Sequence, residues 1–390
     1  MKEIDTDILI VGSGLVGLVA AHTLSSLNYR VMLIDKKNLI DSKEPYNDTR
    51  TVAVSEGSKL FLESLSLWKH LEPIAHPIKT IKVYNRLPQN NISFNNQIKK
   101  NNLGYVIENK NFSKILINKF KKLNNVKILF GNDLKKIELK EQFANAYLEK
   151  IKIKCKLIVA ADGKNSYIKK LTGNKTFKKN YLENALVTNF AHKKNLNSTA
   201  FEIFYNTGPL AILPMKSHNN YYKSTVIWSN KPSFLDKLKN SNDKFFLSFM
   251  EEKIGSIVGE VLKINSRQIF PLSAHINDFF YNKRLVYVGD SAHSIHPIAG
   301  QGWNLGINDV KNLYKVCKNK RFETGSSLFC KNYNELSYNK AFQLFQITDK
   351  LNSHFKMKSH LVTLFNNAGF KLIENQKLLK NQLTSYAMGI

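Results

Sequence analysis

The chain has few cysteines, few arginines and no long uninterrupted apolar run. Its 390 residues include only three cysteines, Cys155, Cys317 and Cys330. They form no CxxC pair and are an odd number, which argues against a structural disulfide or a zinc ribbon and fits a reducing cytoplasm. The most apolar stretch, Ile8 to Leu24, is interrupted by three glycines and has neither a preceding basic region nor a cleavage signal. The sequence therefore predicts neither a signal peptide nor a membrane-spanning helix.

Arginine provides only six of the 58 basic residues, although the net charge is +28. Planar, bidentate recognition of phosphates and bases favours arginine over lysine. The basic excess also avoids residues 1–98, whose net charge is +1, and falls on residues 99–182 (+15) and 183–390 (+12). We therefore expect no nucleic-acid partner. The lysines indicate a solvated surface, with attraction to anionic lipid or to an anionic cofactor as the alternative.

The order of elements predicts an α/β fold of two or three domains. A strand at 7–11, a glycine-rich turn, a helix to about residue 28 and a strand at 30–34 open the chain, and similar buried strands recur at 157–160 and 284–288. Between them, residues 181–269 alternate as in an antiparallel sheet. We expect a Rossmann-like dinucleotide-binding domain (1–76, 99–178 and 283–330), an inserted, mostly antiparallel β-sheet substrate domain (77–98 and 179–282) and a C-terminal helical region (331–390).

The opening turn has the glycine spacing of a dinucleotide-binding motif. Gly12 makes the tight turn, Gly14 lets the backbone approach a pyrophosphate, and Gly17 packs the helix on the strand. Asp35 ends the next strand, 23 residues after Gly12, where a carboxylate binds a ribose and repels a 2′-phosphate. This favours FAD or NAD over NADP as the bound dinucleotide, and no second turn of the same quality follows. The candidate cofactor-binding residues here are Gly12, Ser13, Gly14, Gly17, Asp35 and Lys36.

A second motif, GDSAHSIHPIAGQGWNLG, runs from Gly289 to Gly306. Asp290 ends a strand and offers an acceptor to a polyol. The Gly-Gln-Gly turn opens a helix, whose positive end could hold the negative charge that a reduced flavin carries. His293 and His296 invite a metal interpretation, but no further ligand is clear and we predict no metal site.

The chain resembles the FAD-dependent aromatic hydroxylases of ubiquinone biosynthesis, the UbiH/UbiI/UbiF type, within the p-hydroxybenzoate hydroxylase-like class of flavoprotein monooxygenases. The resemblance covers nearly all the chain. It rests on GSGLVG, Asp48-Thr49-Arg50 with the following TVAVS, Gly104 to Asn109, Asp162-Gly163, the motif at 289–306, and a tail that includes Thr348-Asp349, Leu351, Phe355, Leu379-Lys380 and Ala387-Met388-Gly389.

The resemblance implies further contacts with FAD. Arg50 would lie over the phosphates, and Asn109 matches a position where relatives place Gln or Arg near the ribityl phosphate. Asp162-Gly163 would border both FAD and the nicotinamide donor. Asp290 would bind the ribityl chain and Pro297 would face the reactive edge of the flavin. The pyrimidine side would be covered by Gly300, Gln301, Gly302 and Asn304.

The resemblance also implies the reaction. NADPH would reduce the flavin, dioxygen would form a C4a-hydroperoxide, and the terminal oxygen would pass to the ring of a polyprenylated phenol on the way to ubiquinone. The chemistry is that of the cofactor, so no catalytic side chain is assigned and the proton acceptor for the phenol stays open. The protein would be cytoplasmic, with peripheral contact to an anionic membrane and membership of a ubiquinone-biosynthesis complex as further expectations.

Other functions remain open from the sequence alone. On the same fold, the alternatives are a hydroxylase of a soluble aromatic acid and a flavin reductase of isoprenoid chains. An NAD-dependent dehydrogenase would share only the first motif. A non-catalytic basic protein that binds nucleic acid or membrane would purify without flavin colour.

Overall fold

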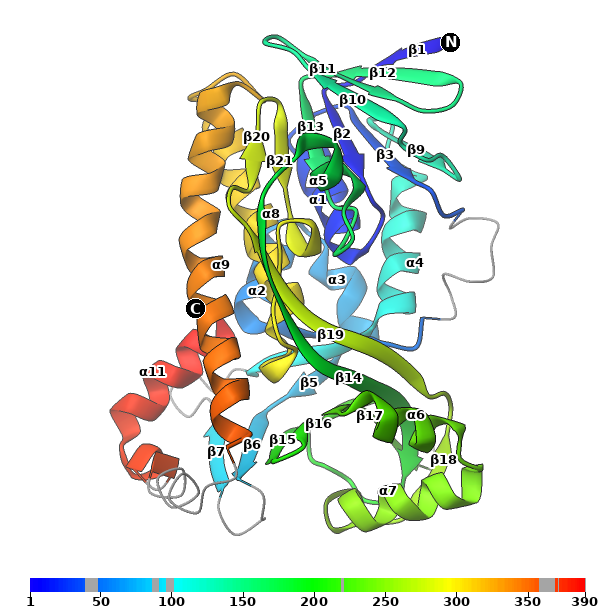
Figure 1. The fold of residues 1–390 in the computed structure, drawn as a ribbon, viewed down its shortest axis with the longest axis vertical. Coiled ribbons are helices and arrows are strands. Elements are labelled where there is room, and N and C mark those ends of the chain that lie inside the picture. Colours follow the sequence, from blue (N-terminus) through cyan, green and yellow to red (C-terminus); the bar gives the residue numbers. More distant parts are fainter. Residues whose placement is uncertain are drawn as a thin grey trace.

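The computed structural model describes residues 1–38, 48–85, 91–95, 102–218, 221–357, 369–370 and 372–389. Parts of the predicted segments 77–98 and 331–390 therefore lie outside the described residues. The predicted fold class is confirmed: a mainly parallel sheet with helices, a large, mostly antiparallel sheet and C-terminal helices make up the molecule (Figure 1).

A six-stranded sheet forms the core of the predicted cofactor-binding part. Its order is β20 (Tyr281–Asn282), β21 (Leu285–Tyr287), β13 (Leu157–Ala160), β2 (Ile8–Val11), β3 (Val31–Asp35) and β9 (Val126–Phe130). All neighbours are parallel except the β20–β21 pair. Strands β2, β13 and β21 are buried along their whole length, and their sequences are accordingly continuous apolar runs. The carboxyl ends of these parallel strands consequently meet at one edge of the sheet.

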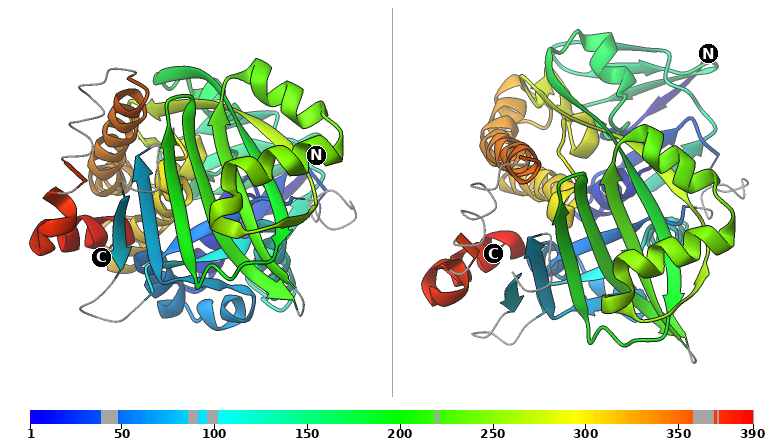
Figure 2. Two further views of the ribbon diagram at one scale, coloured as in Figure 1. Left: turned by 90° about the horizontal axis from the view of Figure 1, so that it is seen from below. Right: turned by 60° about the horizontal axis from the view of Figure 1, so that its bottom comes forward.

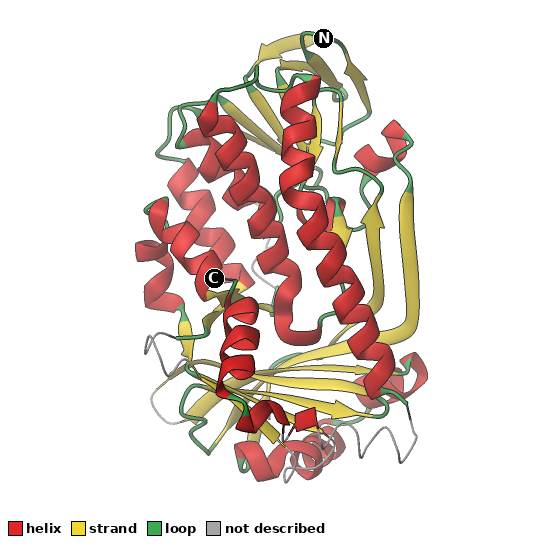
Figure 3. Ribbon diagram, turned by 90° about the vertical axis from the view of Figure 1, so that its left-hand side faces the viewer, coloured by secondary structure: helices red, strands yellow, loops and turns green. Residues whose placement is uncertain are grey.

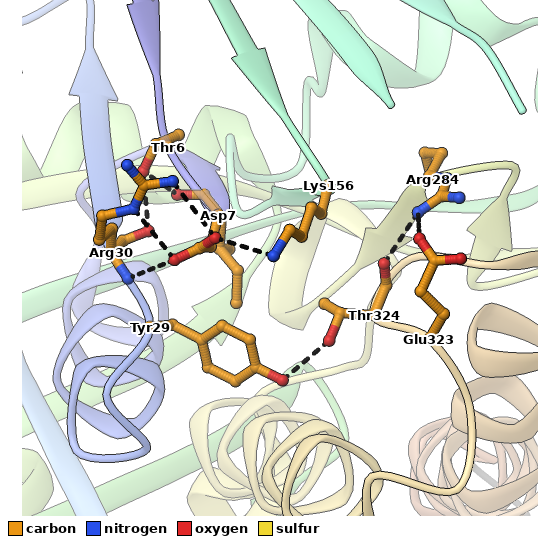
Figure 4. A network of polar contacts seen from close by, with 9 residues as sticks. Thr6, Asp7, Tyr29, Arg30, Lys156, Arg284, Glu323 and Thr324 are labelled. Atoms are coloured by element: carbon orange, nitrogen blue, oxygen red, sulfur yellow. Dashed lines mark hydrogen bonds and ion pairs between the residues drawn. The ribbon is translucent and has the colours of Figure 1, made fainter. Parts of the chain in front are cut away.

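Ion pairs connect the chain segments at the amino ends of these parallel strands, where β2 and β13 begin (Figure 4). The carboxylate of Asp7 accepts hydrogen bonds from the backbone N–H and Nε of Arg30, at 3.0 and 3.3 Å, and lies 3.1 Å from Lys156 Nζ. Arg284, just before β21, is almost completely buried and donates to Glu323 and to the Thr324 carbonyl, both at 2.9 Å. Two of the few arginines therefore stabilise the end of the sheet away from the carboxyl edge.

A nine-stranded sheet forms the second part of the molecule. Its strands are β6 (Thr80–Asn85), β7 (Asn91–Asn95), β14 (Thr176–His192), β15 (Thr199–Tyr205), β16 (Gly208–His218), β17 (Tyr221–Asn230), β18 (Val261–Ile264), β19 (Gln268–Asn277) and β22 (His293–Ser294). Helices α6 (Pro232–Asn240) and α7 (Asp243–Val258) pack on one face (Figure 2), where Trp228, Leu235 and Phe246 belong to one apolar cluster. The long strands β14 and β19 run from the cofactor-binding part into this sheet (Figure 1).

The remaining elements link or cover these two sheets. They are a four-stranded sheet of β1 (Lys2–Asp5), β10 (Lys136–Leu139), β11 (Ala144–Tyr147) and β12 (Ile151–Cys155), a three-stranded sheet of β4 (Thr51–Ser55), β5 (His76–Ile78) and β8 (Gly104–Glu108), and the helices α1 (Leu15–Ser25), α2 (Glu56–Ser64), α3 (Trp68–Leu71), α4 (Asn109–Phe120), α5 (Tyr167–Thr172), α8 (Gln301–Asn319), α9 (Ser327–Phe355) and α11 (Lys377–Met388). Long helices lie alongside one another on one side of the molecule (Figure 3). None of the helices in the described ranges combines the length and apolar character needed to cross a bilayer.

The three cysteines are buried and unpaired. Burial raises the pKa of each thiol to about 12, so the reactive thiolate is scarce at neutral pH. Their environment is that of small apolar core residues.

Buried neutral histidines predict acid-sensitive folding. Burial lowers the pKa of His22 and His192, of His275 to about 3, and of His296 to about 4. An unfolded chain binds protons on these rings below about pH 6.5, whereas the folded chain does not, so their contribution to stability is full above about pH 6.5 and is lost as the pH falls toward about 4. We expect the free energy of unfolding, measured with urea, to fall steadily over this range.

The variant His275→Gln tests this explanation. It should lose about 2 kcal/mol less stability than the unaltered protein between pH 6.5 and pH 5. Equal losses in both proteins would assign the acid sensitivity to other groups.

Candidate cofactor site

The glycine-rich turn between β2 and α1 contains two glycines that the fold itself requires. A Cβ on Gly12, whose φ is +107°, would lie 2.2 Å from the Ala161 carbonyl oxygen. A Cβ on Gly17 would lie 2.0 Å from the Gly12 carbonyl oxygen. Around Gly14, in contrast, a Cβ would meet nothing within 4 Å. The open space at Gly14 lies at the positive N-terminal end of α1, and it fits the approach of a pyrophosphate.

The carboxylate of Asp35 accepts hydrogen bonds from the same turn. Its Oδ2 accepts hydrogen bonds from the backbone N–H and the hydroxyl of Ser13, at 2.7 and 2.6 Å, and its Oδ1 accepts one from Lys37 N–H at 2.9 Å. A carboxylate has about four acceptor positions, so capacity for a ribose hydroxyl remains. The predicted neighbour Lys36 is exposed beside it.

The two glycine motifs lie against each other. A Cβ on Gly289 would lie 3.1 Å from both methyl carbons of Val16, and one on Gly306 would lie 2.8 Å from Val16 Cγ2. Val16 belongs to the first motif, and the two glycines bracket the second. Strands β2, β13 and β21 are also adjacent in one sheet, so the loops that follow them open at the same edge.

Arg50 reaches this edge from the segment before β4. Its guanidinium donates to both carboxylate oxygens of Asp48, at 2.8 and 2.7 Å, and lies 5.3 Å from the centroid of the Phe270 ring. Asn109 donates to Asp48 at 3.3 Å, while its buried Oδ1 has no hydrogen-bond partner. The guanidinium is half exposed, which leaves its outer face free for a phosphate.

Asp290 brings a negative charge to the same place. Its side chain is exposed, yet the surrounding chain reduces its hydration and raises its pKa, an effect that nearby His293, Lys164 and Arg50 oppose. Segments distant in the sequence therefore place cations near the carboxylate of Asp290.

Asp162 follows β13 and lies between these two motifs. Its Oδ2 accepts hydrogen bonds from Tyr167 N–H and Ile168 N–H, at 2.7 and 3.1 Å, and so caps α5. Its Oδ1 is buried without a hydrogen-bond partner, and loss of hydration raises the pKa of the carboxyl group. The next residue, Gly163, has a φ of +82° and open space around it. Together with Asn109 Oδ1, Asp162 Oδ1 is a buried acceptor suited to donors of a polar ligand.

The N-terminus of α8 is held against β4. Gly300 adopts a left-handed conformation with φ of +61°, and a Cβ there would approach Ala53 Cβ to 3.2 Å. Asn304 donates to the Ala53 carbonyl at 2.8 Å and accepts from Ser55 N–H at 2.9 Å and Ser58 Oγ at 2.8 Å. Its amide is thus used within the protein. Among the predicted contacts, the partly exposed residues at this helix end are Pro297, Gly300, Gln301 and Gly302.

His293 has a structural partner. Its Nε2 lies 2.7 Å from Asp309 Oδ2, which also accepts a hydrogen bond from Gly289 N–H at 2.9 Å. Burial alone would lower the pKa of His293, but the Asp309 carboxylate raises it overall. No group of three or more potential metal-ligating side chains occurs in the described part of the chain.

The sequence analysis missed a second polar cluster beside His296. It contains Tyr181 and Glu183 of β14 and Asp349 and Lys356 at the end of α9. Asp349 entered the analysis only as part of the family-like tail. No local motif joins residues this far apart in the sequence.

Comparison with known proteins agrees with this geometry. A family model described as an FAD binding domain matches residues 5–341. The chain belongs to this FAD-binding family. The predicted resemblance is confirmed. The chain is 26% identical to the ubiquinone hydroxylase UbiL of Rhodospirillum rubrum, over 98% of this chain and 89% of the relative. It is also 26% identical to the ubiquinone hydroxylase UbiM of Neisseria meningitidis, over 98% and 85% respectively.

The fold of this FAD-binding family member is that of a solved monooxygenase. The p-nitrophenol 4-monooxygenase PnpA from Pseudomonas putida DLL-E4 superposes with a TM-score of 0.78 at 16% identity, covering 100% of this chain and 99% of PnpA. At this level of identity the likeness concerns the fold.

Substitutions at two of the glycines should separate flavin binding from folding. Gly14→Val should leave the thermal stability of the FAD-free protein within about 0.5 kcal/mol of that of the unaltered protein, because the new side chain enters open space. The same side chain should block the pyrophosphate, and the protein should purify without yellow colour. Absorbance near 450 nm and thermal unfolding measure the two effects.

Gly17→Val is the matched control. Its side chain would collide with the Gly12 backbone, so folding should be impaired by about 3 kcal/mol or more. If the Gly14→Val protein keeps a full complement of flavin, the proposal that the pyrophosphate binds at this turn is wrong.

Proposed function

We propose that the protein is an FAD-dependent monooxygenase that hydroxylates the ring of a polyprenylated phenol in ubiquinone biosynthesis. The observation that carries this proposal is the meeting of the two glycine motifs at Val16, with the charges of Arg50 and Asp290 near each other. Membership of the FAD-binding family and relatives named ubiquinone hydroxylases support it.

The residues around the two glycine motifs fit the parts of FAD. Gly12, Gly14 and Gly17 would receive the pyrophosphate and Asp35 the adenosine ribose, with Arg50 and Asn109 toward the phosphates. The buried free oxygen of Asp162 offers an acceptor between them. Bound FAD would supply the activation of dioxygen with electrons from NADPH. At the other end Asp290 would hold the ribityl chain, Pro297 would lie at the reactive edge, and the first turn of α8 would lie over the pyrimidine side.

The nine-stranded sheet offers an apolar site for the substrate. The face opposite α6 and α7 carries Ala200, Leu213 and Met215. On the same strand as Ala200, Phe204 stacks on Phe355 of α9 with ring centroids 3.9 Å apart. An apolar enclosure excludes water from the reacting oxygen and suits an isoprenoid tail.

The partly buried carboxyl of Glu202 also favours a phenol over an aromatic acid. Glu202 alternates with Ala200 and Phe204 and so shares this face. Burial raises its pKa to about 8, so it is mostly uncharged at pH 7. It provides no positive charge for a substrate carboxylate.

We propose the domain division given above, with residues 77–98 and 179–282 as the substrate domain. Cytoplasmic location, peripheral membrane contact and association with other ubiquinone-biosynthesis proteins belong to the same proposal. Their support is the apolar nature of the substrate and the lysine-rich surface.

Oxygen labelling tests the reaction. The purified protein with FAD, NADPH, ¹⁸O₂ and the probe 2-geranylphenol should give a hydroxylated geranylphenol that contains one labelled oxygen atom, detected by mass spectrometry. Asp290→Ala should weaken FAD binding about tenfold and lower the yield at limiting FAD. Hydroxylation of 4-hydroxybenzoate in preference to 2-geranylphenol would instead establish a soluble aromatic acid as the substrate.

Vesicle sedimentation tests membrane contact. Ile347, Leu351 and Met357 line an open recess on α9, and Leu378 of α11 is 81% exposed. The double variant Met357→Glu/Leu378→Glu should bind vesicles of phosphatidylglycerol at least about tenfold more weakly, because each side chain loses its burial in lipid.

The control for this experiment is Leu60→Glu, which changes an exposed leucine of α2. It should bind the vesicles like the unaltered protein. Binding that depends on neither Met357 nor Leu378, or that does not weaken with added salt, contradicts the proposed contact.

A further inference from the structure

The imidazole of His296 is buried without hydrogen-bond partners. The side chain is completely enclosed, and neither Nδ1 nor Nε2 has a partner. A buried polar atom without a partner costs about 1–3 kcal/mol of folding stability. Such groups in native proteins call for an explanation, for example a catalytic role or a partner supplied by a ligand. His296 directly precedes Pro297, which the proposed function places at the reactive edge of the flavin.

Strand β14 supplies the surroundings of this imidazole on one side. The Tyr181 ring meets it edge to face, with centroids 4.9 Å apart. The pairing of β14 with β19 shifts between Asn180 and Glu183, so Tyr181 and Leu182 bulge out of the ladder, and Leu182 takes a φ of +55°. Glu183 follows the bulge and its Oε2 lies 3.9 Å from His296 Nε2. The bulge thereby directs an aromatic ring and a carboxylate toward one histidine.

Helix α9 completes the surroundings. Asp349 and Lys356 are seven residues apart, two helical turns, and so share a face of this region. Lys356 pairs with the Oε1 of Glu183, and Asp349 pairs with Lys179 of β14 at 2.7 Å. The carboxylates of both Glu183 and Asp349 are near enough to stabilise a positive charge on the histidine.

A base is also required by the chemistry of the proposed reaction. When oxygen adds to a phenol ring, electrons flow from the ring oxygen toward the attacked carbon, and the O–H proton becomes strongly acidic. A neutral imidazole is a sufficient acceptor at that moment, although it would not ionise a resting phenol. Burial keeps the pKa of His296 low, at about 4, so its imidazole is neutral at pH 7 and one of its two ring nitrogens can accept a proton.

We infer that His296 is the catalytic base that accepts the phenolic proton of the substrate, and that Tyr181 and Glu183 are positioning residues for its imidazole. This inference rests on the proposed function. The O–H bond breaks as its electron pair forms a carbonyl bond in the ring, and the proton passes to an imidazole nitrogen. The ring carbon gains one oxygen atom of dioxygen as a hydroxyl group, while the other atom leaves as water with the two electrons from NADPH. The same carbon then loses its hydrogen as a proton to water. The ring electrons return to the carbonyl oxygen, which takes the proton back from the imidazolium.

The variant His296→Gln tests the inference in the FAD-loaded protein with NADPH and 2-geranylphenol. Flavin content should be unchanged, whereas the rate of hydroxylated product at pH 7 should fall about 100-fold, the usual contribution of a general base. The deficit should shrink as the pH rises toward the pKa of the phenol. It should also shrink with a ring-fluorinated geranylphenol, whose proton is more acidic. The matched control His70→Gln changes an exposed histidine and should retain the unaltered rate.

A second variant covers the case in which His296→Gln does not fold. Glu183→Gln keeps the imidazole but removes the negative charge 3.9 Å from its Nε2, so the rate should fall severalfold with the same recovery at high pH. The inference is overturned if either folded variant hydroxylates at the unaltered rate, or if its deficit is the same at every pH and with both phenols. Failure of the unaltered protein to hydroxylate 2-geranylphenol would contradict the proposed function itself.

Discussion

The contact of Val16 with Gly289 and Gly306 is the constraint on which the cofactor site depends. It holds the first turn of α1 against the loop after β21 and the first two turns of α8. Those elements present backbone N–H groups at two helix ends, and Arg50 and Asp290 lie at their margin. A larger residue at either glycine would separate the helices, so the second motif needs small residues there for packing as well as for ligand contact.

Buried polar atoms without hydrogen-bond partners occur at both proposed binding sites. Asp162 and Asn109 each keep a free oxygen on the proposed FAD side, and His296 and Tyr181 keep free polar atoms on the proposed substrate side. In both places a polar ligand would supply the missing partners. Buried polar atoms without partners lower the folding stability of the protein. Stability alone therefore does not explain why these groups are buried.

The sequence was sufficient where the signal is local. The strand at 157–160 has the predicted bounds, and the Gly12 to Asp35 spacing placed a carboxylate beside the glycine turn. It was insufficient where partners come from distant segments. The sequence does not show that the Asn304 amide binds the 53–58 segment, or that the neighbours of His296 come from a bulge and from α9. Periodicity reports which face is buried but not what packs on it.

The order of strands in the six-stranded sheet also bears on how the molecule assembles. Strand β2 is made first, yet its neighbour β13 comes from the middle of the chain and β21 from its last third. A ribosome must therefore release most of the polypeptide before the parallel core can close, and the edge of β2 lacks its neighbour β13 until residue 160 has been synthesised. Such an edge is a natural client for a chaperone during synthesis.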